Sequence, residues 1–111
     1  MKIYEILQES INPRDVDILA TQVNKLGIDV ASYIQNVITN LKDNPEKISG
    51  ETLFNLKTYA DIFIDDFEKS VTDFNKTCEI LSVNKDTVSD NNNSFKETRS
   101  LIKSLRQELD K

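Results

Sequence analysis

The stretch from Glu51 to Leu81 constrains the fold most, because it holds neither glycine nor proline and repeats apolar residues at helical spacing. The repeats come at steps of three and four, which line one side of a helix. They are Leu53, Leu56, Ala60, Phe63, Phe67, Val71, Phe74, Cys78 and Leu81. At a rise of about 1.5 Å per residue such a helix is about 46 Å long, so the rest of the chain must pack along it. We predict one long helix within residues 49–82.

The composition favours an all-α fold for the whole chain. Its 111 residues include only two glycines and two prolines, so the turn-rich composition of an all-β protein is missing. A chain of this length has room for one domain with a modest core. We therefore predict a single helical domain over residues 1–111, built as a helical bundle with a coiled-coil-like antiparallel hairpin.

Three short helices are predicted in residues 1–48, ahead of the long helix. Apolar residues at helical spacing place them at residues 2–11, 13–26 and 29–41. Gly27 is expected to end the second of them in a left-handed conformation. The third is expected to end before Pro45, because a residue that precedes proline avoids helical geometry. All three would pack on the long helix.

A polar turn is predicted over residues 83–93, followed by a final helix over residues 94–110. Most residues of the turn are Ser, Thr, Asn or Asp, whose side chains compete with helical hydrogen bonding. Ser94 then begins a capping box, with Glu97 three residues later. The long helix and the final helix would therefore form a hairpin.

A continuous helix is the alternative to this hairpin. Apolar residues also recur at every seventh position from Leu53 to Leu109 without a break, as they would in one extended coiled coil. The companion seam positions through the middle are polar, and consecutive polar layers would be costly in a continuous zipper. Those positions are Ser70, Thr77, Asn84, Asn91 and Thr98. We therefore favour the hairpin.

Charge supports the hairpin as well. The long helix is acidic between Asp61 and Asp73, whereas lysine and arginine recur along the final helix. Folding back at about Val88 would set the two charged faces against each other. The expected pairs are Asp73 with Lys103, and Asp66 or Glu68 with Arg106. Each exposed pair contributes only ~0.2–1 kcal/mol, so the pairs would set register more than stability.

The sequence argues against an enzyme. It has no histidine, which removes the commonest general base and the usual nitrogen ligand of metals. Asp61, Asp65 and Glu68 share one face of the long helix and could bind a hard cation, but helical di-metal sites normally add histidines, so we interpret the trio as a solvated acidic face. Residues 86–97 match a calcium-binding EF-hand loop only in part. We expect no catalytic, metal or cofactor site.

The net charge of −5 argues against nucleic acid and anionic membrane surfaces as partners. Charged residues interrupt the start of the chain, and no apolar run is long enough to span a membrane. Cys78 is the sole cysteine, so no disulfide can form within the chain. We expect a cytoplasmic protein.

The long apolar stripe indicates a protein–protein interaction or assembly subunit, because three short helices would leave part of it uncovered. We expect self-association into a homo-oligomer or a protein partner. The expected interaction residues are Phe63, Phe67, Val71, Phe74 and Leu81. An acidic helical chaperone or inhibitor of a basic or secreted partner is the first alternative. A carboxylate-dependent metal-binding enzyme is the second.

Overall fold

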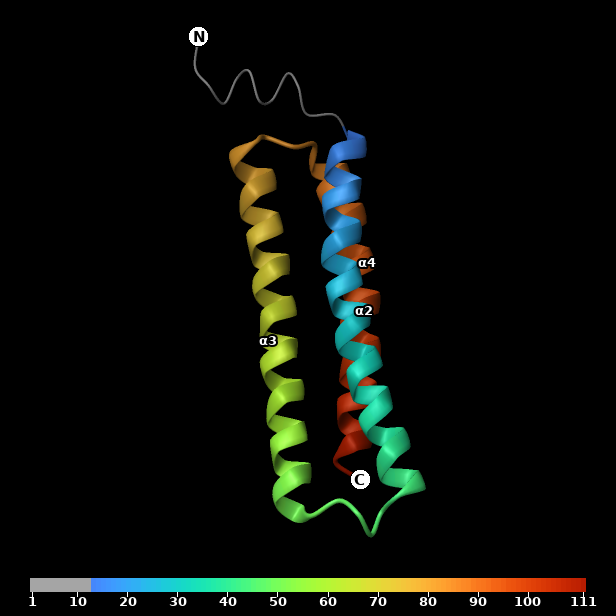
Figure 1. Cartoon of the computed structure of the whole chain (residues 1–111). Coiled ribbons are helices and arrows are strands. Elements are labelled where there is room, and N and C mark those ends of the chain that lie inside the picture. The colour runs from blue at the N-terminus through green and yellow to red at the C-terminus, as the bar shows by residue number, and fades with distance from the viewer. Residues whose placement is uncertain (1–12) are drawn as a thin grey trace.

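The computed structural model describes residues 13–111, which form three long helices (Figure 1). α2 spans Pro13–Asp43, α3 spans Gly50–Ile80 and α4 spans Lys85–Leu109. The chain runs down α2, back up α3 and down α4, so α2 and α4 are parallel and α3 is antiparallel to both. Helix accounts for 88% of the described residues, and no strand occurs among them. The all-α class is confirmed, while the short helix predicted over residues 2–11 lies outside the described residues.

α2 corrects the prediction of separate short helices over residues 13–26 and 29–41. The helix continues through Gly27, and no glycine in the described part of the chain has a positive φ angle. The reason is tertiary packing. A Cβ atom on Gly27 would lie 2.5 Å from Thr98 Cγ2 and 2.8 Å from Phe67 Cε2. Glycine therefore lets α2 approach both other helices closely, and it does not act as a left-handed cap.

Gly27→Ala should lower the free energy of unfolding by about 1–3 kcal/mol, because the added methyl group overpacks the contact with Phe67 and Thr98. Helix propensity alone predicts the opposite sign, since alanine is favoured over glycine by about 1 kcal/mol in a helix interior. Gly50→Ala is the matched control, because a Cβ there meets no atom within 4 Å. Urea unfolding followed by circular dichroism measures both variants. A Gly27→Ala chain as stable as the original would contradict this packing.

α3 confirms the long helix predicted within residues 49–82. Ser49 is its N-cap, and the Ser49 side-chain oxygen accepts a hydrogen bond from the Thr52 backbone N–H at 3.1 Å. The buried residues of α3 all belong to the predicted apolar stripe. They are Ala60, Phe67, Val71, Phe74 and Cys78. An apolar repeat of about eight turns without glycine or proline thus favours a single helix.

The hairpin is confirmed, but its turn comes earlier than predicted and is shorter. The chain reverses over residues 81–84, and α4 begins at Lys85. Asn84 is the N-cap, with its side-chain oxygen accepting from the Asp86 backbone N–H at 2.7 Å. The predicted polar turn over residues 83–93 and the predicted cap at Ser94 are therefore wrong, because most of that segment is the first part of α4.

The asparagines of the mispredicted turn stay helical because they find partners inside the bundle. Asn75 of α3 and Asn92 of α4 form a reciprocal amide pair, in which each Nδ2 donates to the other Oδ1, at 3.0 and 2.7 Å. Each of these amides also donates to the carbonyl four residues earlier in its own helix. Asn91 donates to Asp17 of α2 at 3.2 Å. Because these side chains already have hydrogen-bond partners, they gain nothing by bonding to the backbone of a turn, and the segment stays helical.

Two bidentate ion pairs join α3 to α4. Arg99 donates to Glu68 at 2.6 and 2.9 Å, and Arg106 donates to Asp61 at 2.8 and 3.2 Å. The earlier turn shifts α4 along α3, so the register differs from the prediction. The expected pairs that do not form are Asp73 with Lys103, and Asp66 or Glu68 with Arg106. The predicted attraction between the two charged faces is present, with other partners.

The turn after α3 contains a strained residue. Ser82 has a φ angle of 55°, which makes it the one non-glycine residue with positive φ in the part of the chain described. Val83 N–H donates to the Cys78 carbonyl at 2.9 Å, and Ser82 N–H donates to the Glu79 carbonyl at 3.1 Å. This is a Schellman motif with serine where glycine is usual. The left-handed conformation costs an L-residue about 1–2 kcal/mol.

Ser82→Gly should therefore raise the free energy of unfolding by about 1 kcal/mol, since glycine adopts the left-handed conformation without the Cβ penalty. Ser89→Gly provides the control, because Ser89 is exposed within α4, where glycine lowers stability by about 0.5 kcal/mol. Urea midpoints of the two variants should move in opposite directions. A loss of stability in Ser82→Gly would contradict the strain at this position.

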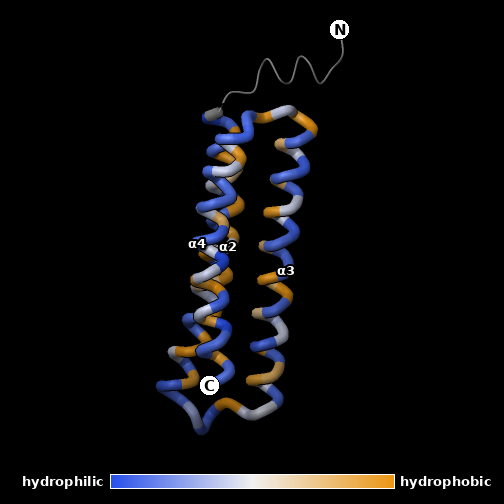
Figure 2. The backbone as a smooth tube through the Cα atoms, turned by 180° about the vertical axis from the view of Figure 1, so that it is seen from behind, coloured by the Kyte–Doolittle hydropathy of each residue, from blue (hydrophilic) through white to orange (hydrophobic). Residues whose placement is uncertain are grey.

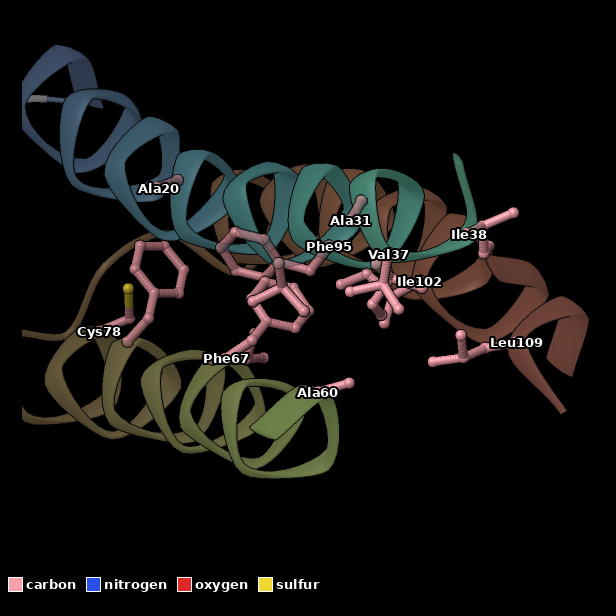
Figure 3. Packing of buried hydrophobic residues seen from close by; sticks show 14 of the residues in the cluster. Ala20, Ala31, Val37, Ile38, Ala60, Phe67, Cys78, Phe95, Ile102 and Leu109 are labelled. Carbon is pink, nitrogen blue, oxygen red and sulfur yellow. The ribbon is translucent and has the colours of Figure 1, made fainter. Parts of the chain in front are cut away.

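The core lies where the three helices face one another. Figure 2 shows hydrophobic residues recurring along all three helices, and Figure 3 shows their side chains meeting between the helices. The rings of Phe74 and Phe95 meet edge to face, with centroids 5.2 Å apart, and join α3 to α4. The largest fully buried side chains are Phe67, Phe95, Ile34 and Ile102. All three helices therefore contribute to one core.

Candidate functional site

The structure divides the expected interaction residues between the core and the surface. Phe67, Val71 and Phe74 are buried within the chain's own bundle, and Phe67 is 0% exposed. Figure 3 shows Phe67 among the side chains that meet between the helices. Phe63 keeps 37% of its surface exposed, and Leu81 is half-buried at the end of α3. The first three residues therefore hold the fold of a single copy together. Only Phe63 and Leu81 remain available at the surface.

An apolar groove lies between α2 and α3, beside Phe63. It has a volume of about 240 Å³. Tyr33 and Phe63 meet edge to face in it, with ring centroids 5.1 Å apart. The Tyr33 hydroxyl donates to the Leu56 carbonyl at 3.3 Å, and burial raises the pKa of Tyr33, with the neighbouring Tyr59 adding to the shift. The residues of this α2–α3 groove are Leu26, Asp29, Val30, Tyr33, Phe63 and Asp66.

Exposed apolar side chains adjoin the groove residue Phe63 on the surface of α3. Tyr59, Ile62, Phe63 and Asp66 are three, one and three positions apart, so they share one side of the helix. Tyr59 and Ile62 are each about half exposed. Clustered apolar side chains at a surface mark interaction sites, whereas single ones are ordinary. This side of α3 is therefore the strongest candidate for a binding surface.

A second hollow lies between α2 and α3, closer to the α3–α4 turn. It has a volume of about 310 Å³ and is bordered by Ile18 and Leu19 of α2 and by Leu81. Ile18 and Leu19 are both exposed. Exposed apolar residues thus border two separate hollows between α2 and α3.

Acidic residues lie on both sides of α3, but they differ in their surroundings. Asp29 and Asp66 border the α2–α3 groove, where they add negative charge to an apolar surface. On the side facing α4, Asp61 and Glu68 are held by arginines, and the hydrogen bond from Arg99 to Glu68 raises the pKa of the Arg99 guanidinium. In the described part of the chain, no group of three or more Asp, Glu, His or Cys residues could hold a metal ion.

Cys78 lies on the buried stripe of α3 between Phe74 and Leu81. It is a free cysteine, and burial raises the pKa of its thiol. A raised pKa keeps the thiol protonated at neutral pH, and the thiolate is the nucleophilic form. Cys78 therefore acts as a small apolar residue of the core.

Phe67→Ala should lower the free energy of unfolding by about 3–5 kcal/mol, because it removes a fully buried ring from the centre of the core. Phe63→Ala should cost less, about 1–2 kcal/mol, since part of that ring is already in water. Asp65→Asn should change stability by less than about 0.5 kcal/mol, as expected for an exposed side chain. Chemical unfolding ranks the three variants, and an equal loss for the two phenylalanines would contradict their different burial.

Sequence reasoning missed the α2 side of the groove. Leu19, Leu26 and Tyr33 recur at every seventh position of α2, and this signal was available in the sequence. Reading Gly27 as a helix end divides the repeat between two short helices, which hides it. The groove becomes recognisable only when residues 13–43 are treated as one helix.

Comparison of the chain with protein-family models, with curated proteins and with solved structures found no match. None of the helices in the described part is long and apolar enough to cross a membrane.

Proposed function

We propose that the protein is a non-enzymatic helical interaction protein, and that the α2–α3 groove receives a helix of another protein. The observation that carries this proposal is the gathering of exposed Tyr59, Ile62 and Phe63 beside a groove lined by Leu26 and Tyr33. A groove between two helices accepts an amphipathic helix that presents apolar residues at steps of three and four.

Burial of apolar side chains supplies the driving force for such a complex. Fully burying one large apolar side chain contributes about 1.5–3 kcal/mol. The rings of Tyr59 and Phe63 provide large contact area with few rotatable bonds, as aromatic residues do at binding surfaces. The Tyr33–Phe63 ring contact fixes the groove before a partner arrives. Little reorganisation is then needed on binding, which favours affinity.

Charge defines the kind of helix that fits. Asp29 and Asp66 border the groove, and the chain carries a net charge of −5. A partner helix with lysine or arginine beside its apolar face therefore complements the site. The same charges support the second candidate function, an acidic chaperone or inhibitor that shields a basic partner. The two functions would use the same groove.

A synthetic peptide of leucine and lysine, patterned as an amphipathic helix, tests the proposal. We expect it to bind and to shift the amide NMR signals of Tyr33 and Phe63. A peptide with the same composition in scrambled order should bind much more weakly, because it cannot present one apolar face. The scrambled peptide thus separates helix recognition from simple charge attraction.

Ile62→Glu and Leu101→Glu form a matched pair of variants for this titration. Both side chains are 49% exposed, but Ile62 directly precedes the groove residue Phe63 on α3, whereas Leu101 lies on α4. Both variants add one negative charge. Ile62→Glu should weaken peptide binding about tenfold or more, equivalent to about 1.4 kcal/mol, while Leu101→Glu should change it little. Equal effects of the two substitutions would overturn the proposed site.

A further inference from the structure

We propose that the chain also forms a domain-swapped dimer, in which the α3–α4 turn straightens and α4 of one copy occupies the α4 position in the bundle of a second copy. The partner is a second copy of this chain, and the contacts exchanged are those of the core. The inference does not depend on the α2–α3 groove, so it can fail or succeed separately from the proposed function.

The sequence on both sides of the α3–α4 turn is compatible with one continuous helix. Residues 51–111 contain neither glycine nor proline. An apolar residue occurs at every seventh position through the turn, and all of these side chains are buried or half-buried in the hairpin. They are Leu53, Ala60, Phe67, Phe74, Leu81, Val88, Phe95, Ile102 and Leu109. A straight helix would keep this whole stripe on one side.

The two connections of the bundle differ in whether they can straighten. The connection between α2 and α3 contains Pro45, which removes a helical hydrogen bond and prevents a continuous helix. The α3–α4 turn covers only residues 81–84 and holds Ser82 in a left-handed conformation. A short hinge under strain favours domain swapping, because opening releases the strain.

Opening the turn breaks local hydrogen bonds, those of the Schellman motif and of the Asn84 cap, and leaves the contacts at the centre of the core in place. A surface hollow of about 560 Å³ lies beside it, bordered by Ser82, Val83 and Val88. Ser82 is exposed, and both valines are only half-buried. The hinge can therefore change conformation without uncovering the centre of the core.

The contacts that hold α4 in place can all form between two copies. α4 is bound to α3 by the Arg99–Glu68 pair and the Asn75–Asn92 amide pair, and to α2 by the hydrogen bond from Thr98 to Asn24 at 2.9 Å. A second α4 brings the same side chains to the same places. The balance between hairpin and swapped dimer is then set by the hinge and by the protein concentration.

Hinge variants test this balance by light scattering after size exclusion, with each chain refolded at high concentration. Ser82→Gly relieves the strain in the hairpin and should yield mainly monomer. Ser82→Ala with Asn84→Ala removes the N-cap of α4 and favours a continuous helix. We expect the double variant to hold at least a threefold larger dimer fraction than Ser82→Gly. Equal dimer fractions, or no dimer in either variant at any concentration, would overturn the proposal.

A distance measurement separates the swapped dimer from other dimers. Spin labels are placed on Asp65→Cys and Lys103→Cys in a Cys78→Ala background, and labelled chains are refolded with excess unlabelled chain. The dimer fraction should give a distance within one chain of about 57 Å, from about 1.5 Å per residue of continuous helix. In the hairpin the two positions flank the Arg99–Glu68 contact and give a short distance. A dimer that gave the short distance would be held together by surface contacts between two hairpins. That result would overturn the domain swap and would not affect the function proposed for the α2–α3 groove.

Discussion

The close approach of α2 to the other two helices at Gly27 is the contact on which the bundle depends. The missing side chain leaves room for the fully buried ring of Phe67 from α3 and for Thr98 from α4. Three helices meet at this level, so the register of any pair constrains the third. The hydrogen bond between Thr98 and Asn24 lies about one helical turn away on α2 and fixes the same level with a polar contact. The packing at Gly27 therefore fixes how α2 lies against α3, and the shape of the α2–α3 groove depends on that arrangement.

The helical class and α3 could be predicted because a long apolar repeat without glycine or proline permits one local conformation. The errors at Gly27 and at residues 83–93 share a physical cause. Both rest on local preferences that are correct for an isolated peptide, and both are overridden by partners from distant parts of the chain. Gly27 meets Phe67, and Asn92 meets Asn75. A turn predicted too late in the chain also gives the wrong ion pairs between α3 and α4. The attraction between the two charged faces does not depend on the position of the turn, and it is present in the structure.

The candidate surface was harder to predict than the fold. The apolar stripe of α3 was visible in the sequence, but its division into core and surface depends on the lengths of the helices that cover it. Because α2 and α4 are both long, they bury Phe67 and Phe74 and leave Phe63 at the edge. The α2–α3 groove also needs Leu26 and Tyr33 from the second helix. The spacing of apolar residues in the sequence indicates which face of a helix they share. It does not indicate which residues of a neighbouring helix form a groove with them.

The down-up-down order of the helices also determines how a force along the bundle would be distributed. Residue 13 and residue 111 lie at opposite ends of the bundle (Figure 1). Tension between them would shear α2 against α4 along their common axis, so the contacts between these two helices, among them the Asn91–Asp17 and Thr98–Asn24 hydrogen bonds, would be loaded together. Force applied between these two points would therefore meet the α2–α4 contact along its length.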